Sequence, residues 1–197
     1  MRLTYASSSA EDYEGEDAAI FTRIATRRHP RPPIPLDLAL LRSPPVADGW
    51  NAFLGRIRSG TSLAAGIQEL AICRIAVLND AAFEWRAHAP LALKGGLPRE
   101  ALEAVKSLEV VGPGAEIKVD GEGALDGDMW AVVAYTDQMT RSVKVDEGVF
   151  GNLKERFGEK KVVEFTATIA AYNCVSRFLV ALDVGEMNGK ELEMPEV

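Results

Sequence analysis

The sequence predicts an all-α protein with one main domain. Apolar residues recur at the spacing of one helix face through most of its 197 residues. Prolines and glycines interrupt this pattern where turns between helices are expected. The composition is 47% hydrophobic, which is enough to bury a core at this length. Only residues 109–124 depart clearly from the helical pattern.

In the first part of the chain, prolines separate the expected helices. Residues 11–28 carry apolar side chains on one face, and the prolines between positions 30 and 35 end this helix. A short helix is expected over 37–42, and a longer one with an apolar face over 46–58. The apolar residues of the two longer helices are Ala18, Ile20, Phe21, Ile24 and Ala25, then Trp50, Phe53, Leu54 and Ile57.

The helix expected over 63–78 is almost entirely apolar. Its strongly polar side chains are Gln68, Glu69 and Arg74. A helix of this composition is expected at the centre of the fold, buried on most sides. The next helix is expected over 81–94, where Gly95-Gly96 ends it. Pro98 suits the first turn of a further short helix.

The second half of the chain contains the least helical segment and the longest helices. Residues 109–124 fit a short β excursion and a mobile loop equally well. Gly121-x-Gly123 is not a dinucleotide-binding fingerprint, because no convincing strand precedes it and its neighbours are acidic. Helices are expected over 125–140, 146–157 and 160–182. The tail from residue 185 is polar and is expected to be loose.

The charge of the chain excludes several classes of partner. The formal net charge of -7 argues against nucleic acids and anionic membranes. The apolar runs are too short to cross a bilayer, and the N-terminus lacks the apolar core of a signal peptide. We therefore expect a cytoplasmic protein with a small-molecule substrate. The short basic cluster Arg27-Arg28-His29-Pro30-Arg31 is interpreted as a solvated helix end.

Cysteine and histidine usage argues against thiol and metal chemistry. Cys73 and Cys174 lie far apart, each in an apolar helical pattern, and no CxxC motif is present. Neither a redox dithiol nor a structural zinc site is therefore predicted. Both thiols are expected to be buried and to act as small apolar side chains. Because His29 and His88 are the only histidines, we expect no metal.

Three side chains between residues 69 and 88 could carry proton-transfer chemistry. Glu84 and His88 are four residues apart, so they share a helix face, where a carboxylate can orient an imidazole and share its proton. The alternative is an ordinary surface pair. Glu69 lies on an apolar helix face, so its carboxylate needs a partner or a raised pKa. Glu69 is therefore expected either to pair with an arginine or to act as a proton store beside His88. The candidate arginines are Arg74, Arg86 and Arg177.

Five further residues are candidates for substrate binding. Arg86 and Arg177 could hold an anionic substrate, and Tyr172 could line the same cavity. Asn79 lies in the turn between the two helices that carry the acid and base residues. Trp85 flanks the Glu84–His88 pair, although an aromatic side chain at this position is more typical of a core or an interface.

The segment from Glu69 to His88 resembles the carboxymuconolactone decarboxylase and AhpD-like superfamily. The resemblance covers about residues 63–105 and rests on Glu69, Asn79, Glu84-Trp85-x2-His88 and the Gly-Leu-Pro sequence that ends at Pro98. It implies an AhpD-like helical bundle over residues 36–184, with a helical arm at 1–35 and a polar tail at 185–197. It also implies a homo-oligomer (dimer, trimer or hexamer) that needs no cofactor.

One branch of this superfamily carries a CxxC dithiol, and this chain departs from that pattern. The AhpD-like branch has an upstream glutamate and a histidine that Glu69 and His88 match, but Ala81 and Glu84 occupy the cysteine positions. Thiol redox chemistry therefore cannot be carried over, because neither residue supplies a thiolate. The proton relay that remains resembles the decarboxylase branch. Arg42 stands where similar sequences have a histidine, so any role of that histidine is lost or changed.

The sequence leaves two principal hypotheses. The first is a cofactor-independent lyase or isomerase acting on a small lactone or a carboxylated, enolisable substrate. In this hypothesis His88 is the general acid/base, Glu84 orients it, and Glu69 is a second, buried carboxylate. The second hypothesis is a catalytically silent, helical oligomeric binding module that kept the fold after losing the cysteines. A third, residual redox activity through Cys73 or Cys174, requires a reactive thiol in the folded state.

Overall fold

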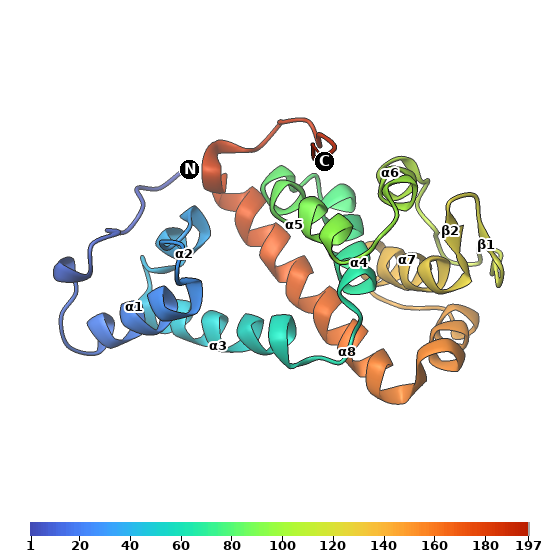
Figure 1. The fold of residues 1–197 in the computed structure, drawn as a ribbon, viewed down its shortest axis with the longest axis horizontal. Helices are drawn as coiled ribbons and strands as arrows, with labels where there is room; N and C mark the ends of the chain where they lie inside the picture. Colours follow the sequence, from blue (N-terminus) through green and yellow to red (C-terminus); the bar gives the residue numbers. More distant parts are fainter. Residues whose placement is uncertain (197) are drawn as a thin grey trace.

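A computed structural model describes residues 1–196 and shows a helical protein with one small hairpin (Figure 1). The helices are α1 (Gly15–Arg28), α2 (Pro35–Leu40), α3 (Pro44–Gly60), α4 (Ala65–Leu78), α5 (Ala82–Lys94), α6 (Arg99–Ser107), α7 (Gly127–Arg141) and α8 (Glu147–Leu182). The hairpin consists of β1 (Gly121–Glu122) and β2 (Leu125–Asp126), and two 3-10 turns, Ala10–Asp12 and Val184–Glu186, flank the helices. The prediction of an all-α fold is confirmed, with each long helix close to its expected position.

Helix α4 forms the centre of the bundle, as its composition predicts. It packs against α5, α6, α7 and α8, and most of its residues are fully buried. Its buried polar side chains all have partners. Gln68, for example, donates from Nε2 to the Ile57 carbonyl at 3.0 Å. An apolar helix without a polar face is stable in water only when neighbours cover it on all sides, and this requirement places α4 in the middle.

Two glycines allow the start of α4 and the end of α5 to approach each other closely. A Cβ atom added to Gly66 would lie 2.8 Å from the Gly95 carbonyl oxygen, and one added to Gly95 would lie 2.8 Å from the Gly66 nitrogen. At the other end, Asp80 adopts a left-handed conformation with φ 51° in the turn between the helices. The close approach of the two glycines and the turn at Asp80 together set how α5, and therefore His88, lies against α4.

A buried salt bridge joins α4, α7 and the segment after α6. Arg74 contacts Asp137 through Nε–Oδ1 and Nη2–Oδ2 distances of 2.7 Å, and both side chains are at most 1% exposed. The remaining guanidinium hydrogens reach the carbonyls of Val105, Leu108 and Glu109. Because both charges are paired and hydrogen-bonded, their burial is tolerated, but loss of either partner would leave an uncompensated charge.

Helix α8 runs along the whole bundle and bends once. Gly158 has φ 75° and ψ 165°, which separates a short first segment from a long second one. The sequence predicts this break, because it places helices over 146–157 and 160–182. By length and composition α8 could cross a membrane, but it packs against α3, α4, α5 and α7 as a core helix does. It is the long diagonal helix of Figure 1.

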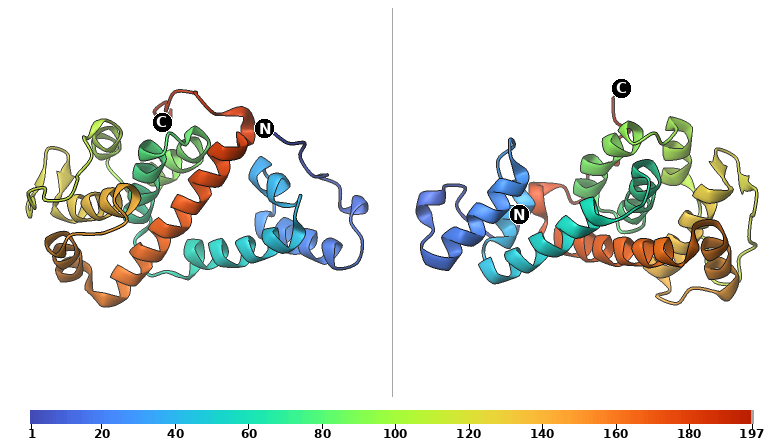
Figure 2. Two further views of the ribbon diagram at one scale, coloured as in Figure 1. Left: turned by 180° about the vertical axis from the view of Figure 1, so that it is seen from behind. Right: turned by 60° about the horizontal axis from the view of Figure 1, so that its bottom comes forward.

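Helices α1, α2 and α3 together form an arm on one side of the bundle, so the arm extends to Gly60 and not only over the expected residues 1–35 (Figure 2). Helix α1 packs on α3, and α3 contacts α8. Arg28 at the end of α1 binds Asp37 in α2 with donor–acceptor distances of 2.7 and 2.8 Å. Between this arm and the bundle lies the cavity that contains the candidate catalytic residues.

The C-terminal tail differs from the expectation of a loose segment. It runs back across α5 and α6, where the Trp85 indole donates to the Glu193 carbonyl at 2.6 Å. Arg99 donates to the Pro195 carbonyl at 3.1 Å. Polar composition alone predicted mobility, whereas these backbone acceptors, provided by the tail itself, hold it on the bundle.

The segment expected to be irregular is a loop with a minimal hairpin. Strands β1 and β2 are antiparallel, with Gly121 opposite Asp126. Gly121 has φ 89°, and a Cβ atom at this position would overlap the Leu125 carbonyl oxygen. Of the two alternatives that the sequence left open, the short β excursion is therefore present.

Candidate functional site

A cavity of about 210 Å³ lies between the arm and the bundle. One face of α5 lines it with Glu84, His88 and Leu91, at positions i, i+4 and i+7. Helix α8 contributes Tyr172 and α3 contributes Arg58. The other lining residues are Arg27, Arg28, Arg31, Ile34, Leu36, Trp50, Leu54, Phe83, Ala87, Val175 and Leu179. The cavity is therefore mostly apolar, with acid, base and cationic groups in its wall.

His88 pairs with Glu69 of α4 at the inner end of this cavity. The His88 Nδ1 and Glu69 Oε2 atoms are 2.7 Å apart, and the Glu69 side chain is 4% exposed. The Arg58 Nη1 and Glu69 Oε1 atoms form a second ion pair at 2.6 Å. Burial raises the pKa of Glu69, but the hydrogen bond to His88 and the charges of His88 and Arg58 outweigh it, so that the net pKa is lowered.

The ionisation of Glu69 sets the tautomer of His88. A carboxylate can only accept hydrogen bonds, so the hydrogen that joins the pair lies on Nδ1 of His88. Nε2 is then the nitrogen that can take a proton from a ligand in the cavity. A carboxylate in this position also stabilises the imidazolium that forms when Nε2 accepts that proton.

Glu84 does not pair with His88, contrary to the expectation from their spacing. Its side chain is 1% exposed, and neither carboxyl oxygen has a hydrogen-bond partner among residues 1–196. Helical spacing brings the two Cβ atoms to one face but does not decide where long side chains end. The orienting carboxylate is Glu69, and the arginine beside Glu69 is Arg58 of α3, not Arg74, Arg86 or Arg177 as proposed from sequence.

Burial favours the protonated form of the Glu84 carboxyl. Desolvation raises the pKa of Glu84 well above its ordinary value, and the nearby Ser176 hydroxyl lowers it only in part. The Ser176 hydroxyl donates to the Tyr172 carbonyl at 2.7 Å and accepts from Asn79 at 3.1 Å, so its hydrogen is already used. A buried carboxyl without a charged partner holds its proton, because the ionised form would lack solvation.

Tyr172 completes the inner wall, as its position in the last helix suggested. Its ring meets the His88 ring edge-on, with centroids 5.0 Å apart and an interplanar angle of 85°. Desolvation by burial raises the pKa of Tyr172, the negative charge of Glu69 adds to this effect, and the nearby Arg58 offsets only part of it. The phenol is therefore neutral and acts as a fixed wall for the imidazole.

Asn79 and Arg177 lie behind the cavity rather than in its lining. The Asn79 amide donates to Asn173 and to Ser176, both at 3.1 Å. Arg177 donates to the Asn173 carbonyl at 3.0 Å and is otherwise exposed. This network ties the α4–α5 turn to α8 and supports Glu84 from behind. Substrate contact, the role proposed for both residues from sequence, is not what their positions favour.

Trp85 and Arg86 lie on the opposite face of α5. With Ala82 and Ala89 they follow the second helical stripe of α5 and face the C-terminal tail. Trp85 is buried and bound to the tail, in keeping with a core aromatic, whereas Arg86 is exposed. Neither residue lines the cavity that contains His88, because one helix cannot present residues 84–88 and 85–89 to the same side.

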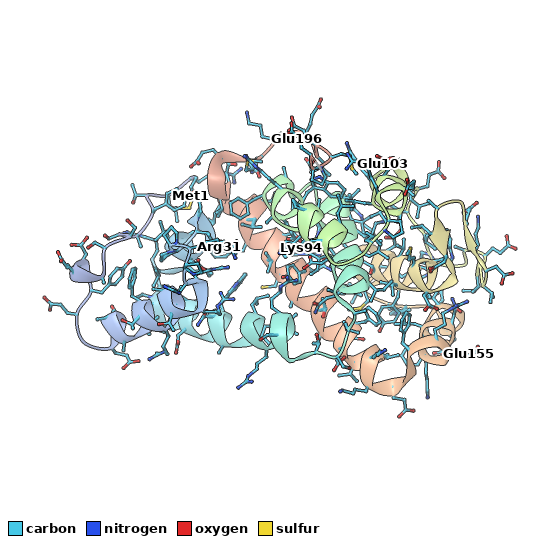
Figure 3. The ribbon with its side chains drawn as sticks, viewed as in Figure 1. Met1, Arg31, Lys94, Glu103, Glu155 and Glu196 are labelled. Atoms are coloured by element: carbon cyan, nitrogen blue, oxygen red, sulfur yellow. The ribbon has the colours of Figure 1, made fainter. Side chains whose placement is uncertain are left out.

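The arm arginines are the lining residues that sequence reasoning missed. Arg27, Arg28 and Arg31 were interpreted as a solvated helix end; Arg27 and Arg31 are indeed exposed, and all three also line the cavity. Their position after a helix, just before a run of prolines, is ordinary, and the sequence does not show which surface the arm covers. Arg31 is labelled in Figure 3 on the side of the arm that faces the bundle.

The two thiols occupy different environments, which corrects one expectation. Cys73 is buried, and burial raises its pKa well above the ordinary value, with Glu69 and Glu84 adding to the effect. Cys174 is exposed, although it lies in an apolar helical pattern. It lies on the outer side of α8, which neighbouring helices leave uncovered. Within residues 1–196, no three His, Cys, Asp or Glu side chains are grouped so that they could hold a metal ion.

The carboxymuconolactone decarboxylase family model matches residues 44–116, which include α3 to α6 and both Glu69 and His88. A crystal structure of an Agrobacterium tumefaciens protein of unknown function, proposed to be an antioxidant defence protein AhpD, has a similar fold with a TM-score of 0.60. The two sequences are 17% identical, and the similarity covers 72% of this chain and 90% of that chain. No curated protein is significantly similar to this sequence.

Proposed function

Because this chain belongs to the carboxymuconolactone decarboxylase and AhpD-like superfamily, we propose that the cavity between the arm and the bundle performs an acid/base reaction without a cofactor. The reaction is a lyase or isomerase step on a small lactone or a carboxylated, enolisable substrate. The observation that carries the proposal is the Glu69–His88 pair next to the buried, unpartnered carboxyl of Glu84. One base and one acid therefore border the same cavity.

In an isomerisation, His88 takes a proton from carbon and returns it. Nε2 accepts the proton of a C–H bond adjacent to a carbonyl group, and the electron pair of that bond moves into an enolate. Glu69 stabilises the imidazolium, and the carboxyl proton of Glu84 forms a hydrogen bond with the enolate oxygen. Return of the proton to another carbon completes the isomerisation.

In a decarboxylation, the electron pair of the breaking C–C bond enters the same enolate, and carbon dioxide leaves. The enolate carbon then takes a proton from His88 in its imidazolium form, and water returns a proton to His88. Both reactions pass through one enolate and require the same two groups, an acid near oxygen and an acid/base near carbon. Thiol peroxidase chemistry is not part of the proposal, because Ala81 and Glu84 cannot supply a thiolate.

The test is proton exchange together with carbon dioxide release. A panel of lactones and enolisable acids, including carboxymuconolactone-type substrates, is incubated with the protein in heavy water and followed by NMR, with carbon dioxide measured in parallel. His88→Ala should lower the rate about 10²–10⁴-fold, the usual range for a general acid/base. His29→Ala is the matched control, since His29 is exposed and does not line the cavity. The enzyme proposal fails if no substrate shows exchange or release that depends on His88.

The second candidate function is a catalytically silent binding module. The absence of cysteine at both of these positions, Ala81 and Glu84, in a chain that still contains the cavity, favours this function. Ligand binding without exchange or release in any member of the panel would support it over the enzyme. Under either function, membership of the superfamily supports a cytoplasmic homo-oligomer. Light scattering on the purified chain distinguishes a dimer, trimer or hexamer from a monomer, and a monomer would overturn that part of the proposal.

A further inference from the structure

The arm brings positive charge to a cavity whose acid and base residues belong to the family region. The family match begins at residue 44, so Arg27, Arg28 and Arg31 lie outside it. The whole chain carries a net charge of -7, which makes a cluster of cations in one cavity wall unusual for it. Charges gathered in this way attract an anion more strongly than isolated surface charges do.

Two of these arginines lack a counter-ion of their own. Both oxygens of Asp37 accept hydrogen bonds from Arg28, and one of them also accepts the Ile34 amide at 2.9 Å. Arg27 reaches the same carboxylate only at 4.0 Å, and its side chain is 28% exposed. Arg31 forms no salt bridge within the described part of the chain. Arg27 and Arg31 are therefore the cations left free to bind a ligand.

The environment of Arg27 favours the binding of an anion beside its guanidinium group. Burial and the adjacent charge of Arg28 lower its pKa, and Asp37 offsets them only partly. An anion bound at this point would relieve the repulsion between Arg27 and Arg28. A planar carboxylate matches the guanidinium fork with two parallel hydrogen bonds.

The remaining wall restricts what such an anion carries. Trp50, Leu54, Leu91 and Leu179 add apolar side chains to the wall of the cavity. The volume of about 210 Å³ is below the roughly 300–1,000 Å³ typical of pockets for drug-sized ligands. The ligand that fits is small, with an apolar body and a single charged end.

We propose that Arg27, assisted by Arg31, binds the carboxylate of a small amphipathic monocarboxylic acid whose apolar body points toward Glu84 and His88. The proposal rests on the proposed function only in using the same cavity, since binding does not require turnover. The carboxylate held by the arm is distinct from the reacting group, so such a ligand fits the isomerisation of the proposed function and not the decarboxylation. Arg27 is thus a binding residue that selects and orients the substrate, and the arm determines specificity.

The experiment measures acids against their uncharged amides by isothermal titration calorimetry. The probes are benzoate, phenylacetate and 3-phenylpropionate, each paired with its amide. At least one acid should bind the wild-type protein at least 10-fold more tightly than its amide, and added salt should weaken only the acid. Arg27→Gln should remove most of this preference and leave the affinity for the amide unchanged, while Arg27→Lys should restore part of it.

Arg23→Gln is the matched control. Arg23 lies on the same helix but pairs with Glu16 and Asp48 and does not line the cavity, so the preference should persist. Arg31→Gln provides a second reduction in preference if Arg27→Gln does not fold. Equal affinity for all three acids and their amides, or a preference that survives loss of either arm arginine, overturns the proposal.

Separate measurements of binding and of turnover distinguish a failure of this proposal from a failure of the proposed function. His88→Ala should lower the rate of exchange by the same factor of about 10²–10⁴, while the preference for acids over amides should persist. An arginine-dependent preference in a protein that never turns over a substrate would contradict only the enzyme proposal. Turnover that depends on His88, in a protein without any preference for acids, would contradict only the role of the arm.

Discussion

Replacing Glu84 by glutamine should change how the stability of this protein depends on pH. Glu84 is 1% exposed, its carboxyl oxygens have no hydrogen-bond partner in residues 1–196, and its pKa lies well above 4.5 in the folded state. Between 4.5 and that raised value, the folded protein keeps a proton that the unfolded chain has released. Raising the pH through this interval therefore favours unfolding, and the stability present below pH 4.5 is progressively lost.

The size of this pH effect follows from the titration of a single proton, the one on Glu84. Each pH unit within the interval should lower the free energy of unfolding by up to about 1.4 kcal/mol. For a chain of this length, that corresponds to about 3–6 °C in Tm per pH unit. Glutamine has nearly the same shape and cannot ionise. Glu84→Gln should therefore remove this slope, so that the variant gains stability relative to the wild type as the pH rises above 4.5.

Urea unfolding of both proteins at pH 5, 6 and 7 measures this difference. Subtracting the two stability curves cancels other titrating groups, including the Glu69–His88 pair, because both proteins contain them. Glu100→Gln is the control, since Glu100 is exposed on α6. A difference between wild type and Glu84→Gln that stays constant with pH would show that Glu84 is ionised in the folded state. The reasoning that makes Glu84 an acid would then be refuted.

Three other predictions concern packing and thiol access. In thermal melts, Gly66→Ala should destabilise the protein by about 1–3 kcal/mol, because the added methyl meets backbone atoms at the end of α5. In the same melts Gly49→Ala, whose added methyl points into open space on α3, should stabilise the protein by up to about 1 kcal/mol. Arg74→Met leaves its carboxylate partner buried and should cost about 3–5 kcal/mol in urea unfolding. A thiol reagent should label exposed Cys174 quickly and buried Cys73 only on unfolding, and Cys174→Ser should abolish the fast phase; fast labelling of both thiols would contradict this assignment and reopen the redox hypothesis.

Most helix ends could be predicted from the sequence because their causes are local. The prolines after α1 and the glycines after α5 act on their own residues and on those within one turn. Helix α4 could be placed at the centre because an apolar helix has no stable alternative in water. The break in α8 was also predictable, since Gly158 lies between two helical patterns.

The sequence predicted which residues form the candidate site better than it predicted the contacts between them. Glu69, Glu84 and His88 all lie at or beside one cavity, yet the hydrogen bond of His88 goes to Glu69, 19 residues away, and not to its helix neighbour. Helical spacing constrains Cβ positions, whereas the end of a long side chain goes where a partner or a void is available. Arg58 was missed for the same reason, since its partner belongs to another helix.

By itself, the sequence determined the helical class, the family, and the residues that could donate or accept a proton. These depend on local preferences, on periodicity, and on which side chains are present. Only the tertiary structure decided that Glu69 orients His88, that Glu84 is buried without a partner, and that the arm closes the cavity with arginines. Those outcomes depend on how distant helices pack, and the burial that packing creates sets both the charge of a carboxyl and the ligand that a guanidinium can bind.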